Sequence, residues 1–208
     1  MRLLLVDHGC CDLPATRVHA LRAALLEQGV EAVACGPSSI PGLAEQPPGL
    51  RGIHLHDVAA ANRRFLAAIR DGSAAAFLSA TGSVSPRLLG LAREAARQAI
   101  GEAVDLVEPE AIFVIHAGIL ADLAIETGVP VALHVSAADL DAARGTARVE
   151  DLVMAALGSA EALVAGDAET ARLLAAEWSD DPCEIWPLDS AAAPRIVATC
   201  REALGRRR

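Results

Sequence analysis

His116 is the residue of this sequence that is best placed to do chemistry. It follows the apolar run Ala111–Ile115, which is typical of a buried strand, and it precedes Ala117 and Gly118. An imidazole at the end of such a strand can donate a hydrogen bond to a ligand hydroxyl or transfer a proton. Gly118 would open the next helix, where backbone amides can approach an anionic group. The alternative is a histidine bonded to a neighbouring loop and a glycine that fits a tight turn.

Several other polar and small residues also follow apolar runs. Because the carboxyl ends of parallel strands meet at one edge of a sheet, these residues are expected to lie together and to line a binding cleft. The residues predicted to bind a substrate there are Gly9, Thr81, Gly82, Gly118, His134, Ser136 and Asp139. Asp7 falls at the same edge. Loops gather at this edge in every such fold, so an ordinary loop cluster is the alternative.

Short apolar runs alternate with segments of helical periodicity along the chain. Strands are predicted at 3–6, 30–35, 53–56, 74–79, 111–115, 131–135, 162–165 and 183–186. Helices are predicted at 15–28, 57–70, 87–108, 118–127, 149–157, 167–178 and 194–204. The segment 37–52 predicts a loop, and Thr81–Pro86 predicts a turn whose amides can cradle a phosphate. This alternation predicts an α/β fold, with a Rossmann-like, doubly wound, mostly parallel sheet covered by helices on both faces.

Composition and charge argue against several classes of protein. A length of 208 residues allows one well-buried domain, and a net charge of −9 argues against nucleic-acid binding. No segment approaches the roughly 18 apolar residues that a membrane helix needs. The cysteines have no framework spacing, which favours free thiols in a cytoplasmic protein. Because no zinc-type spacing occurs and no Gly-x-Gly-x-x-Gly follows the first strand, we expect neither a metal nor a cofactor.

Five motifs in the second half of the chain resemble those of one enzyme family. They are Ala111–Gly118, the turn Gly128–Pro130, the run Val131–Leu140, the run Ala160–Asp167 and the link Ile185–Asp189. In this order they are similar to the N-terminal, acceptor-side domain of retaining family-four glycosyltransferases. Those enzymes have the two-domain GT-B fold, so the resemblance implies that this chain forms one half of it.

The resemblance implies a role in sugar transfer by a hexosyltransferase-like enzyme. His116 would hold the reacting sugar, and Ser136 falls where a turn of the family carries a histidine. The family's donor-binding domain has no counterpart among these residues. We therefore expect 1–189 to form the acceptor-side domain, with a helix and basic tail at 190–208 packed on it. Transfer to a sugar acceptor would require a separate donor-binding subunit, or a homo-oligomer. The alternative is a catalytically inactive α/β module that binds carbohydrate or protein.

Overall fold

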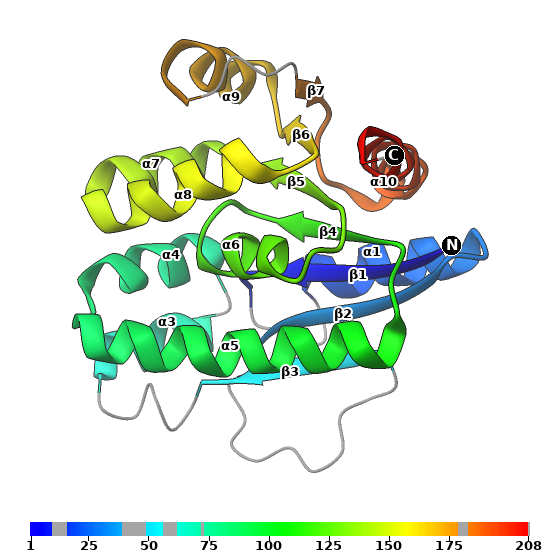
Figure 1. The fold of residues 1–208 in the computed structure, drawn as a ribbon. Helices are drawn as coiled ribbons and strands as arrows, with labels where there is room; N and C mark the ends of the chain where they lie inside the picture. Colours follow the sequence, from blue (N-terminus) through cyan, green and yellow to red (C-terminus); the bar gives the residue numbers. More distant parts are fainter. Residues whose placement is uncertain (10–15, 39–48, 56–61, 72, 179–182, 208) are drawn as a thin grey trace.

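A parallel sheet runs through the centre of the molecule (Figure 1). The computed structural model describes residues 1–9, 16–38, 49–55, 62–71, 73–178 and 183–207. Within these residues the sheet has seven strands in the order β3-β2-β1-β4-β5-β6-β7, and every neighbouring pair is parallel. The strands are β1 (Arg2–Asp7), β2 (Glu31–Ser38), β3 (Leu50–His54), β4 (Ala111–Ile115), β5 (Val131–Val135), β6 (Ala162–Ala165) and β7 (Cys183–Ile185).

Helices cover both faces of the sheet, because alternate side chains of each buried strand point to opposite layers. Leu4 and Val6 of β1 pack with one helical layer, whereas Leu3 and Leu5 face α1 and α10. The helices of the first layer are α3 (Arg63–Asp71), α4 (Ala74–Ser83), α5 (Pro86–Val107), α6 (Ile119–Glu126), α7 (Ala137–Gly145), α8 (Ala147–Ser159) and α9 (Ala168–Leu173). The second layer holds α1 (Arg17–Glu27) and α10 (Ala193–Arg206). The predicted doubly wound α/β fold is confirmed.

The direction of winding reverses between β1 and β4. The chain runs from β1 outward to β2 and β3, and it then returns to place β4 on the other side of β1. Asp7 at the end of β1 lies opposite Ile115 at the end of β4. Open α/β sheets bind their ligands in the crevice outside such a switch point. His116, the residue after β4, therefore stands where a ligand is expected.

The strand predicted at 74–79 is wrong, because this segment begins helix α4. Ser73 caps the helix, and its hydroxyl accepts the N–H of Ala76 at 3.2 Å. The alanines that follow are strong helix formers, and their apolar run has no period that separates a strand from a buried helix. The predicted turn at Thr81–Pro86 is accordingly reduced to the short link between α4 and α5.

Strand β2 extends beyond its predicted end at Cys35, through Pro37 to Ser38. Its pairing with β1 stops at Cys35, and only β3 pairs with the residues beyond. Pro37 therefore lies where one side of β2 has no neighbouring strand, which is a position that tolerates the missing N–H. Strand β3 occupies 50–54 instead of the predicted 53–56. Most of the predicted loop at 37–52 and the predicted helix start at Asp57 lie outside the described residues.

Helix α7 lies where no helix is predicted. Its N-cap is Ser136, and Asp139 completes a capping box by accepting the N–H of Ser136. The helix predicted at 167–178 is divided into α9 and the π-helical turn η1 (Leu174–Trp178). The 3-10 turn η2 (Ser190–Ala192) leads into α10, which packs against β4, β5 and β6.

None of the described helices has the length and apolar character needed to cross a membrane. Cys35, Cys183 and Cys200 are free thiols, and burial raises the pKa of Cys35 and of Cys200 to about 12. Cys10 and Cys11 lie outside the described residues.

Candidate functional site

A histidine–aspartate pair lies at the centre of the site, at the carboxyl ends of β4 and β5. Nδ1 of His116 is 2.8 Å from Oδ1 of Asp139, which belongs to the first turn of α7. Asp139 is fully buried, and its Oδ2 accepts the N–H groups of Ser136 at 2.8 Å and of Ala117 at 3.3 Å. The hydroxyl of Ser136 lies 3.3 Å from the same Nδ1. The end of β4, the end of β5 and α7 therefore meet at one buried carboxylate.

The surroundings of this pair favour a negative charge on Asp139 and a positive charge on His116. Burial alone would raise the pKa of Asp139, but His116 and the N–H of Ser136 hold that pKa below its ordinary value of 3.8. Burial also opposes a charge on His116, yet the carboxylate of Asp139 raises the pKa of the imidazole above its ordinary 6.5. Because Nδ1 is held by Asp139, Nε2 is the nitrogen that can meet a ligand. The pair thus presents one oriented ring nitrogen, which donates when the imidazole is charged and accepts when it is neutral.

The backbone of His116 is strained. Its φ of 79° lies in the left-handed region, which a histidine seldom adopts and which costs on the order of 1–3 kcal/mol. The hydrogen bond to Asp139 and the bond from the His116 N–H to the carbonyl oxygen of His134, at 2.9 Å, keep this conformation. The strain aims the side chain away from the two hydrophobic layers and into the crevice beyond the sheet.

A second histidine, His8, ties β1 to β4 and α6. Its Nδ1 lies 3.0 Å from the carbonyl oxygen of Ile115, and its Nε2 accepts the N–H of Leu120 at 3.1 Å. These partners require a proton on Nδ1 and none on Nε2, so the ring is neutral. Burial, together with the nearby charge of His116, lowers the pKa of His8 to about 4. His8 therefore positions the ends of the strands and does not exchange protons near neutral pH.

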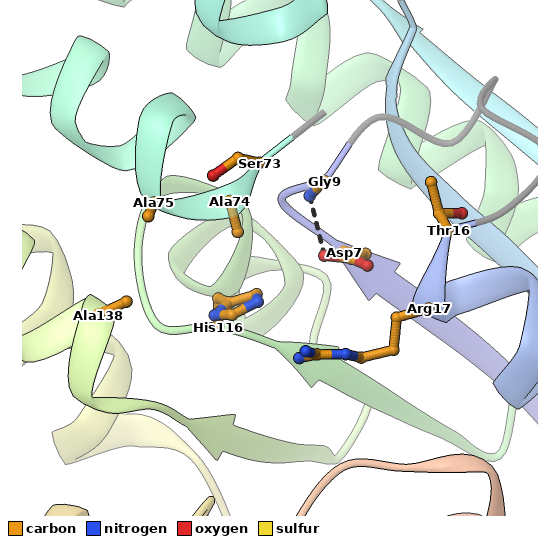
Figure 2. A pocket seen from close by; sticks show the side chains of 9 residues that line it. All are labelled: Asp7, Gly9, Thr16, Arg17, Ser73, Ala74, Ala75, His116 and Ala138. Atoms are coloured by element: carbon orange, nitrogen blue, oxygen red, sulfur yellow. Dashed lines mark hydrogen bonds between the residues drawn. The ribbon is translucent and has the colours of Figure 1, made fainter. Parts of the chain in front are cut away.

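A pocket of about 420 Å³ opens beside His116 (Figure 2). It is lined by the ends of β1 and β4 and the first residues of α1, α4 and α7, namely Asp7, Gly9, Thr16, Arg17, Ser73, Ala74, Ala75, His116 and Ala138. Figure 2 shows the side chain of Arg17 extending from the start of α1 towards His116. Asp7 accepts the N–H of Gly9 at 2.8 Å, and burial raises the pKa of its carboxyl group. The volume suits a small polar ligand.

Some of the predicted site residues meet at this pocket. Gly9 and His116 line it, and Ser136 and Asp139 support His116 from the start of α7. Gly118 lies behind them at the start of α6, in contact with the ring of His8. These five residues therefore form one cluster, in which two residues line the pocket and three lie behind them.

His134 lies under the site, on the sheet face that carries α10. It is 2% exposed, beside the indole of Trp186 and the backbone of Gly166. Neither of its ring nitrogens has a hydrogen-bond partner among the described residues. Burial lowers the pKa of His134 to about 4, so the ring is neutral near pH 7. His134 does not line the pocket.

Thr81 and Gly82 do not reach the pocket. Both lie near the end of α4, whereas the start of that helix lines the pocket. The hydroxyl of Thr81 donates to the carbonyl oxygen of Leu78 at 2.6 Å, and Gly82 packs against Thr146. We leave both residues out of the proposed site.

Arg17 and the start of α4 at Ser73 are pocket residues that the sequence analysis did not single out. An arginine in the first turn of a helix opposes the helix dipole, so its place at the start of α1 was a signal of a role outside that helix. Ser73 before a run of alanines was a readable N-cap. Their meeting with His116 depends on contacts between distant segments, which no local pattern encodes.

The two buried neutral histidines should make the fold sensitive to acid. His8 and His134 have folded pKa values of about 4 against 6.5 when unfolded, so the unfolded chain binds more protons as the pH falls below 6.5. Each histidine should cost up to about 3 kcal/mol of stability by pH 4. Urea unfolding measured from pH 7 to pH 4.5 should therefore show a falling midpoint.

His134→Leu separates this effect from other titrations. Among the described residues, the ring nitrogens of His134 have no hydrogen bond of normal geometry, and the backbone of Trp186 interacts with the ring only weakly, so the variant should fold at pH 7 and lose less stability on acidification. His116 acts in the opposite sense, because its raised pKa gives stability that is present below pH 6.5 and lost as the pH rises through its folded pKa. An acid slope in His134→Leu equal to that of the parent chain would contradict the assignment.

The sequence matches no protein-family model and no curated protein, but the fold has solved counterparts. One is sucrose-phosphate synthase from Thermosynechococcus elongatus, with a TM-score of 0.55 and 12% identity over 97% of this chain and 98% of that one. UDP-GlcNAc 2-epimerase from Methanocaldococcus jannaschii gives 0.52 and 11%, over 90% of this chain and 45% of that one. The epimerase from Rickettsia bellii gives 0.51 and 9%, over 95% and 48%.

At these identities the likeness concerns the fold alone. This chain spans less than half the length of the two epimerases and nearly all of the synthase chain. These counterparts support the fold class that the sheet order indicates. The chain has the Rossmann-like fold of one half of a GT-B protein, and its pocket lies at the switch point.

Proposed function

We propose that this chain is the acceptor-side module of a glycosyltransferase of the retaining family-four type, which acts together with a separate donor-binding subunit. The observation that supports this most is the pocket at the switch point, where Asp139 holds Nδ1 of His116 and leaves Nε2 for a ligand. A ring nitrogen fixed in this way suits a sugar hydroxyl, which both donates and accepts hydrogen bonds in a direction that the pocket can select.

The residues around the pocket take separate roles in this proposal. His116 binds the reacting sugar through Nε2, while Asp139 and Ser136 fix its orientation. Asp7 and Gly9 line the acceptor side. In the transfer, the bond from the anomeric carbon to the nucleoside diphosphate breaks, and the acceptor oxygen bonds to that carbon. The proton of the acceptor hydroxyl passes to the departing diphosphate.

A separate subunit for the nucleotide is supported by composition. Aromatic residues make up 2% of the sequence and tyrosine is absent from it, so little surface is suited to stacking a nucleotide base. The residues that line the pocket include no tyrosine, tryptophan or phenylalanine. The base of a nucleotide sugar would therefore be held by the other unit.

Affinity capture of the tagged chain from its native host, followed by mass spectrometry, tests this proposal. The expected result is recovery of a second chain that carries a nucleotide-sugar-binding domain. Arg17→Glu, at the rim of the pocket, should reduce the recovery. Arg201→Glu, an exposed change on α10, should leave it unchanged. Recovery of the chain alone as a monomer would contradict the split enzyme and would favour the inactive binding module.

A further inference from the structure

The charges in the pocket differ from those of the whole chain. The chain has a net charge of −9, so the molecule as a whole repels anions. The pocket, in contrast, brings the guanidinium of Arg17 and the imidazole of His116 together. Among the described residues, Arg17 belongs to no ion pair and is exposed. A cation on an acidic protein, left without an ion-pair partner beside a pocket, is available to a ligand.

The start of α4 adds backbone donors to these side chains. Helix amides of the first turn have no acceptor inside their own helix. In α4 the side chain of Ser73 accepts the N–H of Ala76, and the carbonyl oxygen of Ser73 accepts that of Phe77. Among the residues that the structure describes, the N–H groups of Ala74 and Ala75 have no acceptor, and both residues line the pocket. They form a pair of donors at the positive end of a ten-residue helix.

Asp7 is the independent sign that this pocket takes a ligand. Its side chain lines the pocket although the residue is only 5% exposed. One carboxyl oxygen accepts the N–H of Gly9, and no hydrogen bond to the other oxygen is present among the described residues. Burial raises the pKa of this carboxyl group. Its second oxygen is therefore open to a hydroxyl group of a ligand.

We propose that this pocket binds the phosphate monoester of a phosphorylated sugar, which is the acceptor of the transfer. This inference rests on the proposed function, because it names the acceptor class of the same site. Arg17 and the amides of Ala74 and Ala75 surround the phosphate oxygens, and Nε2 of His116 is left for the reacting sugar. A phosphate has three oxygens that accept hydrogen bonds from such a mixed set of donors.

Two substitutions remove one donor each with little expected effect on the fold. Arg17→Ala removes the exposed guanidinium. Ala74→Pro removes a backbone N–H at the first position of α4, where proline is well tolerated. Ser73, which precedes it, has φ −88° and ψ 126°, the extended conformation that a residue before proline prefers. Arg201→Ala is a matched control on α10.

The experiment is calorimetric titration of the whole chain with glucose 6-phosphate, glucose, inorganic phosphate and UDP. Glucose 6-phosphate should bind, inorganic phosphate should compete with it, and glucose and UDP should bind more weakly. Arg17→Ala and Ala74→Pro should each lower the affinity for glucose 6-phosphate by about tenfold or more. Arg201→Ala should bind as the parent chain does.

Three results would overturn the inference. The first is no binding of either phosphate compound at millimolar concentration. The second is equal binding of glucose and glucose 6-phosphate, or tighter binding of UDP, which would assign the pocket to a sugar ring or to the nucleotide. The third is unchanged affinity in both Arg17→Ala and Ala74→Pro, with the fold of each checked by circular dichroism. The titration uses this chain alone. Phosphate binding without any captured partner would therefore contradict the proposed split enzyme but would still support the phosphate site.

Discussion

Replacing Asp139 with alanine is expected to lower the free energy of unfolding by about 3–5 kcal/mol, because removing one partner strands the other groups of a buried ion pair. Asp139 is fully buried and accepts hydrogen bonds from His116, Ala117 and Ser136. Its loss also removes the capping box of α7. Urea unfolding at pH 7 measures the change directly.

A matched control lies on the same helix. Asp141 pairs with Arg144 at 3.3 Å, but its side chain is 74% exposed. Asp141→Ala should therefore change stability by about 0.5 kcal/mol or less. A second measurement separates charge from packing: an NMR titration should find the pKa of His116 lowered in Asp139→Ala, because burial would then act without its compensating carboxylate. Equal losses for the two variants, or an unchanged His116 pKa, would contradict the role given to Asp139.

Gly118→Ala is expected to cost about 3 kcal/mol or more. Gly118 has φ 156° and ψ −152°, a conformation that side chains with a Cβ rarely adopt. A Cβ at this position would also lie 2.3 Å from Cδ2 of Leu78 and 3.2 Å from Nε2 of His8. Backbone strain and overpacking therefore add at one residue.

Two other glycines separate these causes. Gly128 has φ 79° with open space around its missing Cβ, so Gly128→Ala should cost only about 1 kcal/mol. Gly101 lies inside α5, where a Cβ meets nothing within 4 Å, so Gly101→Ala should stabilise the chain by about 0.5–1 kcal/mol. If Gly118→Ala and Gly128→Ala lose the same amount, the close approach of Leu78 and His8 is not what makes Gly118 necessary.

The architecture was readable from the sequence because buried parallel strands have a distinctive composition. Residues 3–6 and 111–115 are apolar throughout, and 131–135 are apolar except for His134, as strands covered on both faces tend to be. Helix α5 between them has a clear helical period of buried residues. The strand predicted at 74–79 was wrong because a run of small apolar residues fits a strand or a helix equally well. The N-cap at Ser73 is what selects the helix.

Only part of the candidate site could be predicted from the sequence. His116 and Asp139 were each expected at the sheet edge, but their 2.8 Å contact joins residues from different strand ends and depends on α7, which was not predicted. Arg17 and Ala74 reach the same pocket from helices on opposite faces of the sheet. Such contacts between distant segments depend on tertiary packing, whereas local periodicity predicts only the helices and strands themselves.

Sugar transfer by the captured pair of chains tests the central claim most directly. The pair should transfer labelled sugar from a nucleotide sugar to an acceptor, while neither chain should do so alone. His116→Gln should lower the rate by about a hundredfold or more, because it removes the oriented donor at the reacting sugar. Transfer by the partner alone, or a His116→Gln pair as active as the parent, would contradict the assignment of this pocket as half of a glycosyltransferase site.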